Sequence, residues 1–188
     1  MNPGTTISYQ IDTMDRLIQV NESWTAFALA NGGERVLPEL VLGKTLWHFI
    51  SDTTIQNIYR RLTNLARQGR GALFRYRCDS PQEKRIFQMR VIALLAGKVE
   101  FTSTLLNAEE RPAIPLLNAR APSALLHVRI CSWCHAVAWP GETWRPLESA
   151  AERLIGRGDN ELPDLSHGIC EACAAGMMAM MTAPAPTG

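Results

Sequence analysis

Two pairs of cysteines constrain the fold of this chain more than any other feature: Cys131 with Cys134, and Cys170 with Cys173. In a C-x-x-C segment, two sulfurs lie close enough to occupy two corners of a tetrahedron. Two such segments complete a closed set of four thiolates, which is typical of structural zinc sites. The surrounding region of about 50 residues is too small to build a large hydrophobic core, so a bound metal would supply much of its stability. We therefore predict that these four cysteines bind one zinc ion.

The sequence indicates a reducing environment for these thiols. The first residues lack the basic segment and apolar run of a secretory signal. No apolar stretch approaches the ~20 residues that cross a bilayer. We therefore expect a cytoplasmic protein without membrane contact, where paired cysteines hold metal more often than they form disulfides. Nineteen basic residues against eighteen acidic ones leave a net charge of +1, so no nucleic-acid partner is expected.

Two other interpretations of the cysteine pairs remain open. The pairs could exchange thiols in a redox enzyme or a redox sensor, although such motifs normally follow a strand in a β-α-β unit, which this sequence does not predict. A zinc site that responds to oxidation would combine both chemistries. Cys131 to His135 also fits the C-x-x-C-H pattern of covalent haem, but that attachment takes place outside the cytoplasm and leaves Cys170 and Cys173 without a role.

We expect Ser166 and His167, just before the second cysteine pair, to support the metal site from outside the ligand set. His167 could donate a hydrogen bond to a sulfur or to a backbone carbonyl and so fix the second C-x-x-C turn. Ser166 and Gly168 would shape the same turn. The alternative is a histidine that faces solvent.

The first 107 residues predict an α+β fold with an antiparallel sheet. Asn21 and Asp52 are good N-caps for two helices, and apolar residues follow Asp52 at helical spacing. Later segments alternate with period two, and Ala96-Gly97 suits a tight hairpin. The predicted elements are strands at 7–11 and 16–20, helices at 22–30 and 53–66, and strands at 74–78, 84–95 and 98–106. This order places one face of a sheet against helices.

Composition divides the chain into four parts. Residues 1–107 form the α+β domain, and residues 108–124, which contain three prolines, are predicted to be a linker. Residues 125–181 contain both cysteine pairs and are predicted to form a small zinc-stabilised module. Residues 182–188 are expected to be disordered.

Two segments inside the predicted module have local signals of their own. A hairpin around residues 140–142 and a helix at about 147–155 are predicted between the cysteine pairs. After Cys173, the chain is predicted to continue as a helix that carries Met177, Met178, Met180 and Met181. Methionines suit either a core or an adaptable partner surface, and the sequence does not separate these cases.

The N-terminal part contains motifs that resemble PAS domains. A predicted strand ends in Val20-Asn21, the next helix carries Trp24 and Phe27, and the segment 42–47 reads Leu-Gly-Lys-Thr-Leu-Trp. PAS domains are sensory and dimerisation modules of bacterial signalling proteins. The resemblance covers residues 1–107 and implies a five-stranded antiparallel sheet with helices on one face and a pocket between them. It also implies a regulatory role in signal transduction.

The cysteine region is similar to a second motif. It consists of Ile130 to Cys134, Trp144 to Glu148, and the run Ser-His-Gly-Ile-Cys at 166–170, which continues to Cys173. This pattern resembles a cysteine motif attached to PAS and receiver domains in bacterial signalling proteins. The resemblance supports the same four cysteines as a unit and implies nothing specific about output.

Seven aromatic residues of the N-terminal part could line the implied pocket, although their spacing alone favours a core. They are Trp24, Phe27, Trp47, Phe49, Tyr59, Phe74 and Phe87. His48 could hold haem in such a pocket, but a lone histidine is more often structural. Cys78 lies on a predicted strand, which indicates a small buried hydrophobic residue.

From these features we expect a cytoplasmic regulatory protein that acts through a protein partner or as a homodimer, with a small molecule as the candidate occupant of the pocket. A closed four-thiolate site leaves no position for a substrate water, so we expect no enzyme. Two competing functions stay open: a thiol redox protein and a nucleic-acid-binding zinc module. The second would use Arg129, Arg145, Arg153 and Arg157, which nearby acidic residues offset.

Overall fold

The computed structural model describes residues 2–118, 127–139, 141, 143–155 and 164–183. It has an α+β fold with a five-stranded and a three-stranded sheet. The larger sheet has the strand order β2-β1-β5-β4-β3, and all its neighbouring strands are antiparallel. Its strands are β1 (Thr6–Ile11), β2 (Leu17–Val20), β3 (Ala72–Arg77), β4 (Glu83–Ala93) and β5 (Val99–Glu110). The predicted five-stranded antiparallel sheet is confirmed.

Two helices of this part begin where the sequence predicts caps. The Asn21 side chain accepts a hydrogen bond from the Trp24 N–H at 3.1 Å, and the Asp52 side chain accepts one from the Ile55 N–H at 2.9 Å. These caps satisfy N–H groups that have no partner inside a helix. The helical segments are α1 (Glu22–Ala30), η1 (Glu34–Val36), α2 (Pro38–Val41), η2 (Leu46–Phe49) and α3 (Thr53–Arg67), where η marks a 3₁₀ helix.

Burial along β4 and β5 follows the period-two alternation of the sequence. Phe87, Met89 and Val91 of β4 are buried, whereas Ala93, the last predicted member of that face, is exposed. On β5 every predicted core residue is buried: Val99, Phe101, Ser103 and Leu105. This buried face supports the helices that lie on it.

The turn between β4 and β5 is wider than the predicted two-residue hairpin. It contains η3 (Leu95–Gly97), and the Leu94 N–H donates to the Lys98 carbonyl at 2.8 Å. Ala96 and Gly97 have φ angles of 58° and 72°. A Cβ on Gly97 would lie 2.9 Å from the Thr13 methyl group, so this position favours glycine for space as well as for conformation.

The C-terminal part forms the second sheet, in which strands from distant segments pair. β6 (His127–Cys131) lies parallel to β8 (Asp164–Gly168) and antiparallel to the short β7 (Val137–Ala138). An isolated bridge joins Val137 to Arg145 around the predicted hairpin, of which residues 140 and 142 lie outside the described residues.

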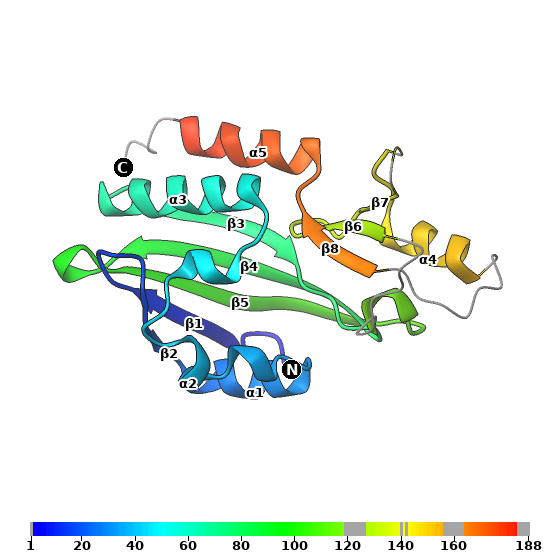
Figure 1. Ribbon diagram of the computed structural model, residues 1–188, viewed down its shortest axis with the longest axis horizontal. Coiled ribbons are helices and arrows are strands. Elements are labelled where there is room, and N and C mark those ends of the chain that lie inside the picture. Colours follow the sequence, from blue (N-terminus) through cyan, green and yellow to red (C-terminus); the bar gives the residue numbers. More distant parts are fainter. Residues whose placement is uncertain (1, 119–126, 140, 142, 156–163, 184–188) are drawn as a thin grey trace.

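Two helices complete the C-terminal part. α4 (Leu147–Ile155) matches its predicted range and buries Leu147 and Ala150 against Val128 and Ile130 of β6. α5 (Glu171–Thr182) follows the second cysteine pair. Figure 1 shows α5 alongside α3, with the smaller sheet and α4 beyond one end of the larger sheet. None of the helices in the described ranges is long and apolar enough to cross a membrane.

The two parts of the chain share one hydrophobic cluster. Ile58 and Leu62 of α3 belong to the same buried group as Met177 and Met181 of α5, and Trp133 from the first C-x-x-C segment joins them. The Arg77 N–H at the end of β3 also donates to the Trp133 carbonyl at 2.8 Å. The cysteine region is therefore packed directly onto the larger sheet and its long helix.

The segment predicted as a linker is partly structured. β5 extends to Glu110, beyond the predicted domain end at residue 107, and η4 (Pro115–Asn118) follows. Ile114 and Leu116 are buried in the core beneath α4. Of the predicted linker, residues 119–126 lie outside the described residues, as do residues 184–188 of the predicted disordered tail.

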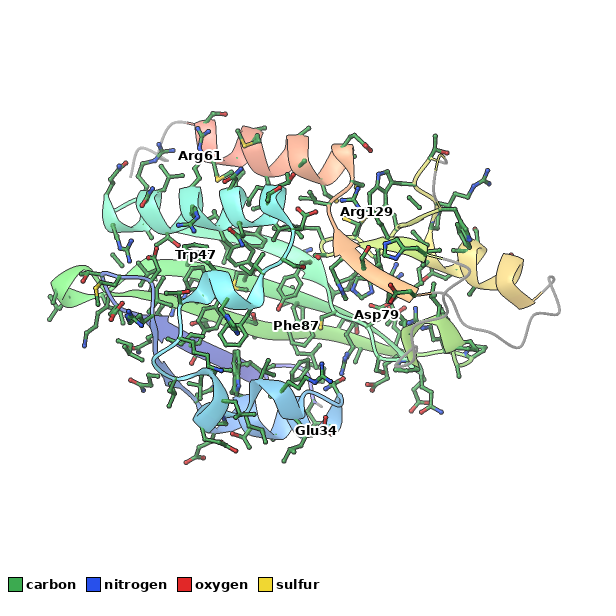
Figure 2. The ribbon with its side chains drawn as sticks, viewed as in Figure 1. Glu34, Trp47, Arg61, Asp79, Phe87 and Arg129 are labelled. Atoms are coloured by element: carbon green, nitrogen blue, oxygen red, sulfur yellow. The ribbon has the colours of Figure 1, made fainter. Side chains whose placement is uncertain are left out.

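A buried carboxylate forms a second connection between the two parts. The Asp79 side chain has no exposed surface and lies 2.9 Å from the Arg111 guanidinium. Arg77 pairs with both Asp79 and Glu148 of α4, and His135 Nδ1 lies 3.7 Å from the Asp79 carboxylate. Figure 2 shows Asp79 near the junction of the larger sheet and the C-terminal strands. This network links the loop after β3 to the first cysteine turn and to α4.

Candidate metal centre

The first C-x-x-C segment is the turn between β6 and β7. β6 ends at Cys131, whose N–H donates to the Ala136 carbonyl at 2.8 Å, while the His135 N–H donates to the Cys131 carbonyl at 2.9 Å. His135 has a φ of 59°, a left-handed conformation that non-glycine residues adopt mainly in turns. These bonds curl the chain so that Cys134 returns toward Cys131.

The second C-x-x-C segment joins β8 to α5. Cys170 is the N-cap of α5, and its sulfur accepts a hydrogen bond from the Cys173 N–H at 3.4 Å. Parallel pairing aligns Gly168 at the end of β8 with Cys131 at the end of β6, and the Ser132 N–H donates to the Gly168 carbonyl at 2.8 Å. The small sheet therefore sets the two cysteine pairs side by side.

The four sulfurs form one compact cluster. All four Sγ atoms lie within 4.8 Å of one another, and Cys134 Sγ lies 3.8 Å from Cys170 Sγ. A tetrahedral ion with metal–sulfur bonds of about 2.3 Å requires sulfur separations of roughly 3.8 Å. Cys131 and Cys170 are buried, and Cys134 and Cys173 are partly buried. The geometry predicted for these residues is confirmed to the extent that the cluster could hold a metal ion.

The electrostatics of the cluster differ from one thiol to the next. Burial opposes ionisation of Cys131, but N–H groups of Cys170, Cys134 and Trp133 point at its sulfur and lower its pKa below the ordinary value. Burial and the neighbouring Cys131 raise the pKa of Cys134 to about 11. The pKa of Cys173 is also raised, by burial first and then by its thiol neighbours. Four thiolates at these distances therefore require a bound cation to balance their charge.

Among the described residues, neither Ser166 nor His167 forms a side-chain hydrogen bond to a cysteine, which is one of the two ways in which His167 was expected to support the site. Ser166 Oγ instead lies 2.8 Å from His127 Nε2 and 3.4 Å from the Val128 carbonyl. His167 lines the cavity described below. The reason is the strand register: β8 still runs through both residues, so alternate side chains leave the sheet on opposite faces before the cysteine turn begins.

Ser166 belongs to a chain of polar contacts that the sequence analysis missed. His127 Nδ1 lies 3.1 Å from Asp164 Oδ2, so a serine, a histidine and a carboxylate follow one another across the β6–β8 pair. This sequence of contacts is the one that activates a serine nucleophile in hydrolases. Here both the His127 and Asp164 side chains are about half exposed, at 50% and 48%. Exposed pairs of this kind contribute little to the free energy of folding. We interpret these contacts as side-chain hydrogen bonds that join β6 to β8 near the start of both strands.

A cavity of about 380 Å³ lies between the larger sheet, its helices and the first cysteine turn. Four of the seven predicted pocket residues line it: Trp24, Phe49, Tyr59 and Phe74. Its walls also include residues that were not predicted: Tyr9, Tyr76, Ser132, Trp133 and His167. Tyr9 shares the face of β1 that carries the buried Ile7 and Ile11, and Trp133 lies within a C-x-x-C motif, so both had a local signal.

The other three predicted pocket residues lie elsewhere. Phe27 and Phe87 pack edge to face, with ring centroids 6.0 Å apart, in a separate cluster. The Arg60 guanidinium lies over the Trp47 ring, with its central carbon 3.9 Å from the ring centroid. The Trp47 indole N–H donates to the Asp15 carboxylate at 3.0 Å. Figure 2 shows Trp47 on η2, in front of the sheet. These rings lie outside the cavity because they pack against neighbouring elements, and the spacing of residues in the sequence does not predict such contacts.

The remaining candidate residues have structural surroundings. His48 is exposed, packs edge to face on Phe49 and does not line the cavity, so it is not placed to hold haem there. His135 lies beside Asp79 rather than in a separate haem site. Cys78 lies one residue beyond β3 and is partly buried, whereas the sequence predicted a buried residue on the strand; desolvation raises the pKa of its thiol.

Comparison with known proteins does not extend this picture. No family model matches the chain, and neither a curated protein nor a solved structure matches it. The resemblance to PAS domains and to the bacterial cysteine motif therefore stays a prediction from the sequence. The conclusions drawn so far rest on the α+β fold and on the cluster of four cysteines.

Proposed function

We propose that this chain is a cytoplasmic signalling or regulatory protein that acts through protein contacts, with a PAS-like sensory domain and a structural zinc site. The sensory assignment is supported by the five-stranded antiparallel sheet and by an aromatic cavity between that sheet and its helices. Both are features that the resemblance implies. The partner is another protein or a second copy of this chain.

Zinc is the metal that the donor set favours. Four thiolates in a tetrahedral arrangement suit zinc, with an iron site as the competing occupant. The four cysteines fill all four positions, which leaves none for a substrate water. The ion therefore stabilises the fold and does not catalyse.

The observation that carries the proposal is the packing of the cysteine cluster against the sensory fold. Cys131 and Cys170 belong to the same buried cluster as Ile55, Ile58 and Leu62 of α3. A change in the position of the cysteines would therefore alter the packing of α3, which covers the sheet. A shift of α3 would in turn alter the cysteine cluster. A regulatory protein requires such contact between its two parts.

A thiol redox function is the second candidate, and the lowered pKa of Cys131 favours it. A low pKa gives the thiolate that thiol exchange needs. The raised pKa values of Cys134 and Cys173 oppose rapid exchange in the metal-free state. The pKa of Cys131 and those of Cys134 and Cys173 thus shift in opposite directions without metal. In a metal-bound cluster the cation keeps all four sulfurs ionised, so this difference no longer matters.

Native mass spectrometry of freshly purified, reduced protein tests the proposal, since it reports metal, bound small molecules and assembly together. We expect one zinc per chain, and a dimer or a complex with a second protein. Cys170→Ser should lose the zinc, while the matched control Cys78→Ser should keep it. A reduced, metal-free chain whose four thiols react readily would favour the redox function. A zinc-loaded chain that stays monomeric without a partner would contradict action through protein contacts.

A further inference from the structure

The cavity has walls from both parts of the chain. Leu17, Val41 and Leu46 come from the N-terminal fold, whereas Ser132 and Trp133 come from the turn between Cys131 and Cys134. Its volume of about 380 Å³ falls within the range of small-molecule sites. The cavity therefore lies directly beside the candidate metal centre.

Its chemistry is that of a site for a neutral, flat molecule. Among the described residues that line it, none is an aspartate, glutamate, lysine or arginine, and seven are aromatic: Tyr9, Trp24, Phe49, Tyr59, Phe74, Tyr76 and Trp133. The rings of Tyr59 and Phe74 each lie 6.1 Å from that of Trp133. Aromatic walls of this kind favour a planar apolar ligand.

Several lining residues carry hydrogen-bond donors that have no partner in the described part of the chain. The Trp133 indole N–H is the one cavity-lining donor among the described residues that is both fully buried and unpaired, and the hydroxyls of Tyr9 and Tyr59 also line the cavity, where a ligand can reach them. Burial raises the pKa of Tyr59 to about 12, so its hydroxyl remains a donor at neutral pH. Buried polar groups are nearly always hydrogen-bonded, and an unpaired one is costly. A ligand with acceptor atoms would satisfy these donors.

Tyr76 differs from Tyr59 in one respect that is useful for a test. It also lines the cavity, but its hydroxyl already donates to Ser103 Oγ at 2.8 Å. Replacing Tyr76 by phenylalanine therefore removes a hydroxyl that is not free to bind a ligand. The two tyrosines provide a matched pair of variants.

We propose that this cavity binds a neutral, planar, largely apolar molecule with hydrogen-bond acceptors, and that its occupancy is coupled to metal binding by the four cysteines through Trp133. The inference rests on the proposed sensory function. Trp133 belongs to the cavity wall and to the metal-binding turn, so a ligand that holds its indole also holds Cys131 and Cys134 in place. Coupling between two binding sites is reciprocal, so bound metal strengthens ligand binding by the same factor.

Binding of coumarin and naphthalene to the zinc-loaded full chain, measured by calorimetry, tests the ligand class. Both probes are flat bicyclic molecules, but only coumarin has acceptor oxygens. We expect coumarin to bind more tightly than naphthalene. Tyr59→Phe should weaken coumarin binding about fivefold, the effect of one lost hydrogen bond, and Tyr76→Phe should leave it unchanged. Equal affinities for the two probes, or no binding of either, would overturn the proposal.

Transfer of zinc from the loaded chain to a colorimetric chelator tests the coupling. At equilibrium, we expect saturating coumarin to raise the zinc affinity of the chain relative to the chelator about tenfold, within the usual range of coupling between sites. An unchanged equilibrium partition of zinc in the presence of bound coumarin would overturn the coupling. The zinc content of the same sample separates the two levels of inference: a chain without zinc contradicts the proposed function, whereas a zinc-loaded chain that binds neither probe contradicts only the cavity proposal.

Discussion

Asp79 lies between two arginines, and its carboxylate has no exposed surface. Burial alone would raise the pKa of this carboxyl group, but the nearby His135 ring and the Arg77 guanidinium outweigh burial and hold the pKa well below its usual range. Because the pKa is lower in the folded than in the unfolded state, the carboxylate stabilises the fold above the unfolded pKa, and this contribution is lost as the pH falls.

Asp79→Asn should therefore lower the free energy of unfolding by about 3 kcal/mol at pH 7, because it leaves two largely buried guanidinium groups with only the half-exposed Glu148 carboxylate as their partner. The difference from the unmodified chain should shrink as the pH falls below about 4, because the Asp79 carboxyl group of the unfolded chain then takes up a proton while the folded carboxylate does not. Urea unfolding at several pH values measures this. Arg90→Gln, which removes the exposed ion pair with Glu100, is the control and should change the free energy by less than about 1 kcal/mol. A pH-independent difference for Asp79→Asn would show that its charge is not the cause.

The sequence predicted which residues belong to the candidate site better than it predicted which residues they contact. The four cysteines were predicted correctly as a cluster because C-x-x-C spacing is a local property. Asp79 lies one residue past the predicted strand at 74–78, and its pairing with Arg111 and His135 depends on tertiary packing. Ser166 was assigned to the cysteine turn, yet it faces His127 from the neighbouring strand. That contact follows from a parallel pairing that has no local signal.

Among the elements, α5 illustrates how packing selects one face of a helix. Met177 and Met181 are buried, with 5% and 2% exposure, and pack with Ile58 of α3. They are four residues apart and so share a helix face. Met178 points away and is 42% exposed. Small apolar residues occupy several sides of α5, so the sequence pattern alone did not show which methionines belong to the core.

Met181→Ala should destabilise the protein by about 3 kcal/mol, because it leaves a cavity between α3 and α5. Met178→Ala, on the same helix but on its exposed side, should change stability by less than about 0.5 kcal/mol. Chemical denaturation of the two variants under the same conditions provides the comparison. Equal effects would contradict the packing of α5 on α3.

Elements with a strong local pattern were predicted well. α3 has a capping aspartate and apolar residues at helical spacing, and β4 and β5 alternate with period two. By contrast, the parallel pairing of β6 with β8 was not predicted, because it joins Ile130 to His167 across a long separation in the chain. Only the cysteine pairs at the strand ends indicated that these segments meet.

For the whole molecule, the shared hydrophobic cluster makes the four-cysteine cluster part of the central fold. The sequence suggested a separate C-terminal module, because composition changes sharply after residue 124. In the structure, Trp133 contacts Tyr59 and Phe74, and Ile114 and Leu116 of the predicted linker are buried. A change in amino-acid composition along the chain can suggest a domain boundary, but it does not show which surfaces pack together.

Cys131→Ser should therefore loosen more than the cysteine region. Without the metal, β6, β8 and α5 should lose their protection from hydrogen exchange, and α3 should lose part of its protection because Met177 and Met181 no longer cover it. The central strands β1, β4 and β5 should remain protected. Exchange measured by mass spectrometry distinguishes these regions. Unchanged protection of α3 would show that the two parts unfold independently.

The proposed function depends on four thiolates that surround one zinc ion. X-ray absorption at the zinc edge of the purified, reduced chain measures this directly. We predict a single shell of four sulfur atoms at about 2.3 Å, unchanged in Cys78→Ser. A shell that contains nitrogen or oxygen, fewer than four sulfurs, or no zinc at all would contradict the central claim.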